Sequence, residues 1–101
     1  MAVTVRLLRL ATRDLDDASR WYLRRNPRRA QRFAQAVDRA VKQIANAPDR
    51  WPVYQGPFRW VRAGRFPYIL YYRILDPSTV LIYAVSHTSR RPGYWKRRSP
   101  P

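Results

Sequence analysis

The stretch FRWVRAGRFPYILYYRILDPSTVLIYAVS, residues 58–86, contains three apolar segments separated by two turn signals. The segments are rich in β-branched and aromatic residues, which favour strands; they are residues 58–63, 66–75 and 79–86. Asp76-Pro77-Ser78 is a turn short enough to require antiparallel neighbours, and Ala63-Gly64 can make the same connection earlier. This part of the chain therefore predicts a three-stranded antiparallel meander.

The residues before the meander begin with a strand and a helix. Apolar side chains recur at every second position from Val3 to Leu7, which predicts a strand over residues 2–9 with one buried face. Thr12 is then expected to cap a helix over residues 13–25. Three aspartates would lie in its first turn, near the positive end of the helix dipole: Asp14, Asp16 and Asp17.

A second helix follows Asn26-Pro27. Proline cannot continue a helix without losing a hydrogen bond, but it suits the first helical position, with Asn26 as the cap. Between residues 28 and 45 the apolar positions follow the i, i+3, i+4, i+7 spacing of an amphipathic helix; they are Ala30, Phe33, Ala34, Val37, Val41 and Ile44. We therefore expect a helical hairpin, followed by a loop over residues 49–57.

The predicted order is one strand, a helical hairpin and three strands. Such segregation of helices and strands is typical of an α+β fold, with the helices packed on one face of an antiparallel sheet. At 101 residues the chain is expected to form a single domain spanning residues 1–101. Residues 98–101, at the proline-rich end, are expected to be a disordered tail.

The charge of the chain is strongly one-sided. It has 21 Lys and Arg residues against 6 acidic residues, all of them aspartate, for a net charge of +15. Such an excess attracts nucleic acid, acidic protein segments or anionic lipid. Arginine outnumbers lysine 19 to 2, so an Arg-rich host proteome is an alternative source of part of this charge.

Several classes of protein are excluded or disfavoured by composition. The chain has no cysteine, which excludes a disulfide framework, thiolate catalysis and Cys-ligated zinc. One histidine and scattered aspartates predict neither a metal site nor a cofactor site. The first ten residues alternate apolar and basic positions, unlike a signal peptide, and no apolar run approaches membrane-spanning length. We therefore expect a cytoplasmic protein that does not contact membranes.

The C-terminal third carries a more specific motif. Arg65-Phe66-Pro67-Tyr68 is followed by Ala84-Val85-x-His87-x-x-Arg90-x-Pro92-x-Tyr94-Trp95. With this motif the chain resembles the RelE/ParE-type toxins of bacterial type II toxin-antitoxin systems, also called plasmid-stabilisation proteins, and it is closer to the ParE side. Further matching residues cover nearly the whole chain: Ala11, Asp14-Leu15, Trp21-Tyr22, Ala30, Phe33, Ala47-Pro48, Arg59, Tyr71-Tyr72 and Arg98.

The resemblance implies a RelE/ParE toxin-like fold, inhibition of bacterial growth and a protein partner. In this family a cognate antitoxin wraps an acidic or amphipathic C-terminal segment over the toxin, which gives a hetero-oligomer. The net charge of +15 fits such a segment independently. ParE-like members are described as poisons of DNA gyrase without nuclease activity, whereas RelE-like members cut messenger RNA on the ribosome.

Cleavage of RNA by its own 2′-hydroxyl needs a base, cations for the phosphate and an acid for the leaving oxygen. His87 can serve as base or acid, and Tyr94 can stack on a base or donate a proton. Four arginines are candidates for the phosphate: Arg59, Arg62, Arg65 and Arg90. The structural alternatives are a hydrogen-bonded histidine at a strand end, solvated arginines that protect a sheet edge, and a Trp95 that anchors the tail.

Two absences favour inhibition by binding over catalysis. The chain has no glutamate to act as base, and its only lysines are Lys42 and Lys96. For the inhibitor we expect an exposed basic and aromatic contact surface, because such residues dominate interfaces; it comprises Trp51, Tyr54, Trp60, Arg62, Arg90, Arg91, Tyr94, Trp95 and Arg98. A third hypothesis is a module that binds nucleic acid through charge alone, with a steep dependence on salt.

Overall fold

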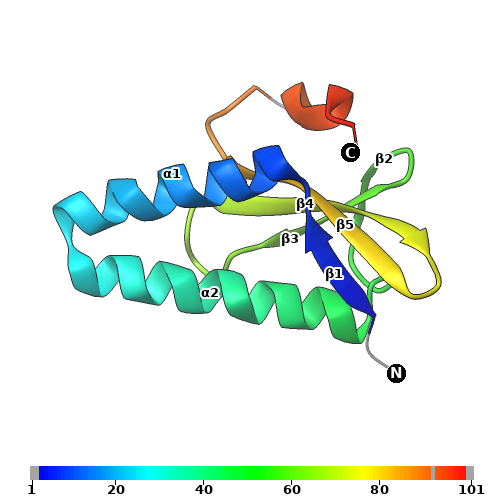
Figure 1. The fold of residues 1–101 in the computed structure, drawn as a ribbon, viewed down its shortest axis with the longest axis horizontal. Coiled ribbons are helices and arrows are strands. Elements are labelled where there is room, and N and C mark those ends of the chain that lie inside the picture. The colour runs from blue at the N-terminus through cyan, green and yellow to red at the C-terminus, as the bar shows by residue number, and fades with distance from the viewer. Residues whose placement is uncertain (1–2, 92, 100–101) are drawn as a thin grey trace.

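The computed structural model describes residues 3–91 and 93–99. In chain order the elements are β1 (Thr4–Leu7), α1 (Arg9–Arg25), α2 (Pro27–Asn46), β2 (Val53–Gln55), β3 (Phe58–Arg62), β4 (Tyr68–Asp76), β5 (Thr79–His87) and the 3₁₀-helix η1 (Tyr94–Arg97) (Figure 1). Over the described residues, no helix has the length and apolar character needed to cross a bilayer.

The sheet has five strands in the order β1-β5-β4-β3-β2. The predicted meander is confirmed, because β3, β4 and β5 pair antiparallel with their neighbours in the chain. The expectation of a wholly antiparallel sheet is wrong, since β1 pairs with β5 in parallel. β2 was expected to be loop; its three residues are too few to produce a periodic pattern, and pairing with β3 makes them a strand.

The helical hairpin is confirmed, but α1 begins four residues earlier than predicted. Its first residue is Arg9, the preceding Leu8 has no capping side chain, and Thr12 lies inside the helix. The start is decided by packing, because Leu8 and Ala11 are almost fully buried. The expected cap at Asn26 is confirmed: its side-chain oxygen accepts hydrogen bonds from the backbone N–H groups of Arg28 and Arg29 at 3.1 and 3.3 Å.

The three aspartates expected in the first turn of α1 lie further along the helix, so the prediction that they complement the helix dipole is wrong. Asp16 and Asp17 are exposed, whereas Asp14 is partly buried against β5. Asp14 therefore contributes to tertiary structure rather than to the start of the helix.

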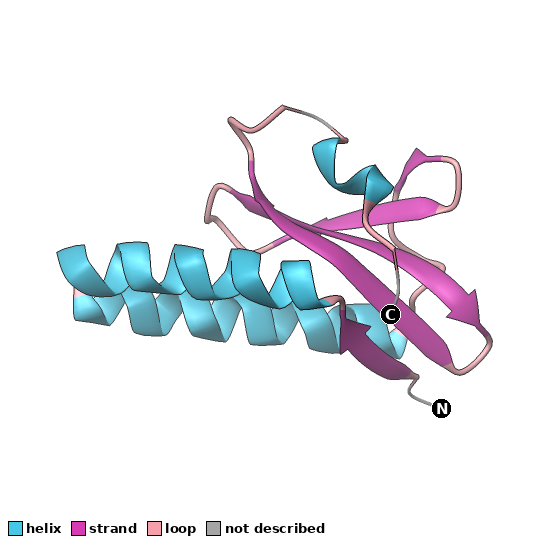
Figure 2. Cartoon of the chain, turned by 45° about the horizontal axis from the view of Figure 1, so that its top comes forward, coloured by secondary structure: helices cyan, strands magenta, loops and turns pink. Residues whose placement is uncertain are grey.

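The two faces of the sheet are covered by different parts of the chain. Leu70 and Tyr71 are neighbours on β4, so their side chains point to opposite faces. Leu70 lies in the core with the helical hairpin, and Tyr71 stacks on Trp95 of η1 with ring centroids 4.5 Å apart. Figure 2 shows η1 lying over the sheet on the side away from α2. The helices thus cover one face, as expected, and the tail covers part of the other.

The expected disorder of residues 98–101 is wrong at Arg98, which is mostly buried and paired with Asp14. Ser99 is exposed, and residues 100–101 lie outside the described residues, as does Pro92 of the C-terminal motif. Gly93 lets the chain enter η1, because its φ of 77° is unfavourable for other residues and a Cβ there would lie 2.7 Å from the Lys96 side chain. We call residues 88–99 the tail; the part of it that forms η1 and ends with Arg98 is folded onto the rest of the chain.

Candidate functional site

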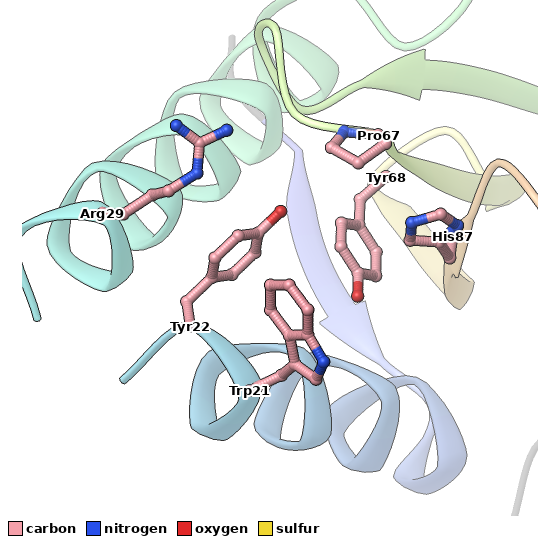
Figure 3. A pocket seen from close by; sticks show the side chains of 6 residues that line it. All are labelled: Trp21, Tyr22, Arg29, Pro67, Tyr68 and His87. Atoms are coloured by element: carbon pink, nitrogen blue, oxygen red, sulfur yellow. The ribbon is translucent and has the colours of Figure 1, made fainter. Parts of the chain in front are cut away.

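The C-terminal end of β5 and the tail form a hollow of about 230 Å³ against α1. Three residues singled out from the sequence meet there: His87 from the end of β5, Arg90 from the loop after it and Tyr94 from η1. Tyr68, at the start of β4, pairs with His87 across the sheet, and their rings are 5.1 Å apart (Figure 3). The structure therefore brings together part of the predicted site.

His87 has one ring nitrogen engaged within its own loop. Its Nδ1 accepts a hydrogen bond from the backbone N–H of Ser89 at 3.0 Å, and the Ser89 hydroxyl lies 2.7 Å from the same atom. Because a backbone N–H can only donate, the proton of the neutral ring is on Nε2. In this arrangement His87 can donate a hydrogen bond, but Nδ1 is not available to remove a proton from a substrate.

Tyr94 lies among cations. The guanidinium carbon of Arg90 is 4.2 Å from the centre of the Tyr94 ring, and that of Arg98 is 5.4 Å away. A cation over an aromatic face is attracted by the negative potential of the ring. These contacts keep positive charge at the rim of the hollow, beside a half-buried phenol.

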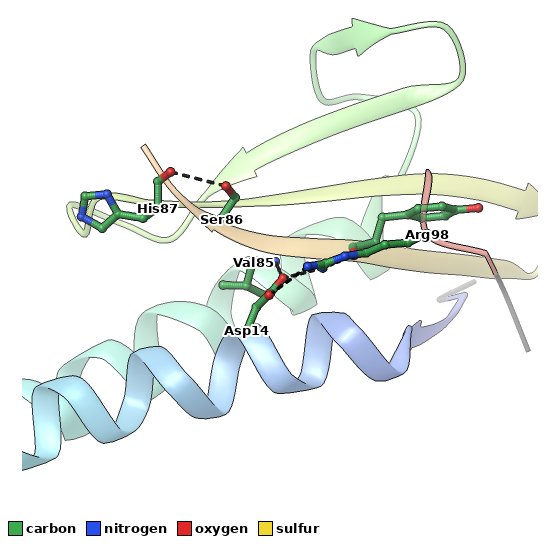
Figure 4. Close-up of polar contacts among 6 residues, drawn as sticks. Asp14, Val85, Ser86, His87 and Arg98 are labelled. Atoms are coloured by element: carbon green, nitrogen blue, oxygen red, sulfur yellow. Dashed lines mark hydrogen bonds and ion pairs between the residues drawn. The ribbon is translucent and has the colours of Figure 1, made fainter. Parts of the chain in front are cut away.

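The tail is held to α1 by an ion pair between Asp14 and Arg98 (Figure 4). Two guanidinium nitrogens of Arg98 bind the two carboxylate oxygens at 2.7 and 3.1 Å, and the backbone N–H of Val85 donates to the same carboxylate at 3.1 Å. Arg98 also donates to the carbonyl of Tyr83 at 3.0 Å. Burial alone would lower the pKa of Arg98, but its bonds to Asp14 outweigh that effect and raise it.

Trp95 is the second attachment of the tail. Its side chain is 1% exposed and packs among aromatic rings on the face opposite to the helices; their centroids lie 4.5 Å (Tyr71), 4.8 Å (Phe58), 5.7 Å (Tyr54) and 6.4 Å (Tyr83) away. Trp95 and Arg98 therefore lie inside the fold and not on the exposed contact surface where the sequence analysis placed them.

The four arginines that were candidates for a phosphate do not gather in one place. Arg59 donates to the carbonyl of Trp51 at 2.6 Å, and Arg62 donates to the carbonyl of Phe66 at 2.9 Å. Three positions apart on β3, the two side chains point to opposite faces of the sheet. Arg65 is exposed in the β3–β4 turn. Each of the two bonded arginines braces a nearby loop, so they do not converge on a phosphate with Arg90.

The remaining predicted contact residues are divided between two places. Trp51 donates its indole N–H to the carbonyl of Gln43 at 3.2 Å, Tyr54 joins the aromatic cluster around Trp95, and Trp60 is partly buried on β3. Arg91 lies with Tyr94 beside η1, around a second hollow of about 460 Å³. We call the tail surface the set of residues that lines these two hollows from the loop and η1: Arg90, Arg91, Tyr94, Lys96 and Arg97.

Sequence reasoning missed Lys96, Arg97 and the partners of the tail on α1. Basic residues next to Trp95 carry no periodic signal, since the run is four residues long. Asp14 was assigned only to the start of the helix and Trp21 only to the family resemblance, and their sequence distance from the tail hides the contact. Over residues 3–91 and 93–99, no three His or Asp side chains gather into a metal-binding group.

Comparison with known proteins identifies the family. A sequence model described as "ParE toxin of type II toxin-antitoxin system, parDE" matches residues 5–92. The chain belongs to the ParE toxin family. A structural match, the chromosomal ParDE toxin-antitoxin system from P. aeruginosa, has a TM-score of 0.72 and 19% sequence identity, covering 85% of this chain and 96% of that chain. This likeness shows a shared fold. A search of curated proteins found no significant match.

The ParE family match extends from β1 to the loop after β5 and ends before η1. His87 and Arg90 lie inside the matched residues, whereas Tyr94, Trp95 and Arg98 lie beyond them. Because the family match ends before η1, the position of the tail is explained by the contacts of Arg98 with Asp14 and of Trp95 with the aromatic cluster.

Proposed function

We propose that this ParE-family toxin inhibits bacterial growth by binding DNA gyrase and holding it in a state with broken DNA. The observation that carries the proposal is the ParE family match over residues 5–92. The geometry supports binding rather than catalysis, because Arg59 and Arg62 brace loops on opposite sheet faces and Nδ1 of His87 is engaged. Plasmid stabilisation is the role that such a toxin would have.

The tail surface is the part of the chain that we propose contacts gyrase. It combines four cations with Tyr94 on η1, which Trp95 and Arg98 attach to the sheet and to α1. Arginine and tyrosine are common among the residues that dominate interfaces. A gyrase-DNA complex presents acidic surface that would attract these cations.

A cognate antitoxin would neutralise the toxin. The structural match from P. aeruginosa is described as a ParDE toxin-antitoxin system, and the net charge of +15 suits an acidic or amphipathic antitoxin segment. We propose that this chain forms a cytoplasmic hetero-oligomer with such a partner. Neutralisation then requires that the segment covers the tail surface or prevents its access to gyrase.

An alternative function is ribosome-dependent cleavage of messenger RNA. The observation that favours it is the meeting of His87, Arg90 and Tyr94 around one hollow. Catalysis there would require that His87 gives up its hydrogen bond from Ser89 before it acts as a base. His87 is therefore the residue whose removal separates the two mechanisms.

The experiment is pulse labelling of DNA and protein synthesis in cells shortly after induction of the wild-type toxin and of His87→Ala. We expect DNA synthesis to stop first, with a DNA-damage response, and we expect His87→Ala to remain toxic. Arg73→Ala, an exposed change on β4, is the matched control for expression. An early collapse of protein synthesis that His87→Ala abolishes, while the variant stays folded, would overturn gyrase inhibition in favour of RNA cleavage.

A further inference from the structure

A third hollow, of about 360 Å³, is lined mainly by aromatic rings (Figure 3). It lies beside the hollow of about 230 Å³ described above and shares Trp21, Tyr68 and His87 with it. We call it the aromatic hollow. Three parts of the chain build it: the C-terminal half of α1, the first turn of α2, and the neighbouring ends of β4 and β5. Its lining residues are Trp21, Tyr22, Arg29, Pro67, Tyr68 and His87.

Two pairs of rings in the aromatic hollow stand nearly perpendicular. Trp21 and Tyr22 meet at 88° with centroids 5.1 Å apart, and Tyr68 and His87 meet at 87° with the same separation. A flat ligand that stacks on one ring of such a pair meets the positive edge of the other. Trp21 is 48% exposed, so much of its ring is accessible to a ligand. The volume lies within the range of small-molecule sites, about 300–1,000 Å³.

The polar groups of the aromatic hollow suit an anion and a hydrogen-bond acceptor. The described residues that line it include no carboxylate, the nearest aspartates of the neighbouring hollow being Asp14 and Asp17, and none of the ion pairs among the described residues involves Arg29. The ring proton of His87 is on Nε2, because Nδ1 accepts from Ser89. Burial, with Tyr22 nearby, raises the pKa of Tyr68, so its hydroxyl keeps a proton to donate. Arg25 places a second guanidinium 3.9 Å from the Trp21 ring centre.

We propose that the aromatic hollow binds a nucleotide, with the base against Trp21 and Tyr68 and the phosphate on Arg29. Rings interleaved with arginines are the recurring means of binding single-stranded nucleic acid, because every base has a face that stacks. An acidic peptide would find one lining arginine and mostly rings, which suit a base better than a row of carboxylates. The inference goes beyond the proposed function, since gyrase inhibition does not require it.

The test is the affinity of the purified chain for a fluorescent oligothymidylate of about ten nucleotides, measured by anisotropy. Trp21→Ala should weaken binding roughly 5- to 150-fold, the effect of losing one stacked base. The matched control is Leu23→Ala, which truncates a 58% exposed side chain on the same helix and should bind as the wild type. Circular dichroism establishes that both variants are folded.

A second pair of variants distinguishes binding at the aromatic hollow from non-specific attraction by the positive charge of the chain. Arg29→Gln and Arg73→Gln each remove one exposed positive charge, but Arg73 lies far along β4 from Tyr68. We expect Arg29→Gln to lose about fivefold more affinity than Arg73→Gln. Equal losses for the two arginines, or wild-type binding by Trp21→Ala, would overturn the proposal and leave only charge-driven binding.

A competition experiment distinguishes the two possible ligands, a free nucleotide and a single strand of nucleic acid. Thymidine monophosphate that displaces the oligothymidylate from the wild type assigns the hollow to free nucleotides as well as strands. A monophosphate that does not compete assigns the hollow to a single strand, which gains affinity from neighbouring phosphates. Either result supports a nucleotide site provided that Trp21→Ala has lost its affinity, and gyrase inhibition by Trp21→Ala tests the proposed function separately.

Discussion

The two faces of the sheet are covered by very different amounts of chain, the first by the helical hairpin and the second only in part, by η1. The helix face is covered by the 37 residues of α1 and α2, whose apolar stripes bury Phe33, Ile44 and Leu70 completely. The opposite face is covered by the four residues of η1, which contribute one large side chain, Trp95. A single ion pair, Asp14–Arg98, closes the edge of that second layer.

This difference separates the part of the molecule that determines its stability from the part that carries its candidate functional surface. Elements with few buried contacts open at low free energy, and binding surfaces are drawn from them. The tail surface stands on such an element, whereas the helix face is a scaffold. Variants that weaken each face should therefore change global stability and local opening to different degrees.

The largest expected effect is that of Phe33→Ala, in the centre of the helix face. Phe33 is fully buried, and its ring lies 5.1–5.3 Å from those of Tyr22, Phe66 and Tyr68. Removing it should lower the free energy of unfolding by about 3–5 kcal/mol, because the helices cannot collapse into the space. Chemical denaturation measures this; a loss below that of Trp95→Ala would contradict the ranking of the two faces.

Trp95→Ala should have the next largest effect, a loss of about 2–3 kcal/mol, less than that typical of a trapped aromatic. Without Trp95 the four-residue helix can detach from the sheet. Water can then reach Tyr71 and Phe58, so no empty cavity remains. Hydrogen exchange should show faster exchange of backbone amides in η1, with little change in α2. A uniform rise in exchange over the whole chain would mean that the tail is part of the main cooperative unit.

Arg98→Ala removes the ion pair but leaves Trp95 in place. Asp14 would keep the hydrogen bond from the backbone N–H of Val85, so the expected loss is about 1–2 kcal/mol. The side chains of the pair are 14% and 16% exposed, so added salt should reproduce only a small part of this loss. Lys42→Ala, which breaks an exposed pair with Asp38, is the control and should change stability by less than about 0.5 kcal/mol.

A further expected effect, confined to high pH, is a pH dependence at Tyr72, on the helix face. Burial raises its pKa from 10.0 to about 12, and its hydroxyl donates to the carbonyl of Pro48. The unfolded chain therefore releases this proton first, and the contribution to stability that is complete below pH 10 is lost as the pH rises towards 12. The free energy of unfolding, measured from pH 9 to 12, should fall less steeply for Tyr72→Phe than for the wild type. Equal slopes for the two proteins would show that Tyr72 does not cause this pH dependence.

Periodic patterns predicted most of this fold, and contacts between distant residues explain where they failed. The apolar stripe of α2 and the turn at Asp76-Pro77-Ser78 are determined by neighbouring residues in the sequence, so both were predicted correctly. The parallel pairing of β1 depends on a strand more than seventy residues away, and a pattern within residues 2–9 contains no information about it. The early start of α1 depends likewise on the burial of Leu8 and Ala11 by other elements.

The candidate site was predictable in its residue types but not in its geometry. His87, Arg90 and Tyr94 stand close in sequence, and they do line one hollow. Arg59 and Arg62 also stand close, yet alternation along β3 sends them to opposite faces. The burial of Arg98 depends on Asp14, which lies 84 positions away in the sequence, and the burial of Trp95 depends on rings from β2 to β5. A charge pattern alone does not indicate such a partner.

Gyrase inhibition can be tested most directly in a DNA-cleavage assay with purified gyrase, supercoiled plasmid, ATP and the wild-type toxin. We expect loss of supercoiling and accumulation of linear DNA after the protein is denatured, equally for the wild type and His87→Ala. Substitution of Arg91 and Arg97 by glutamine should reduce both effects while the variant remains folded. Unimpaired supercoiling and no linear DNA, at a toxin excess over gyrase and with a reference gyrase poison active in parallel, would rule out gyrase as the target.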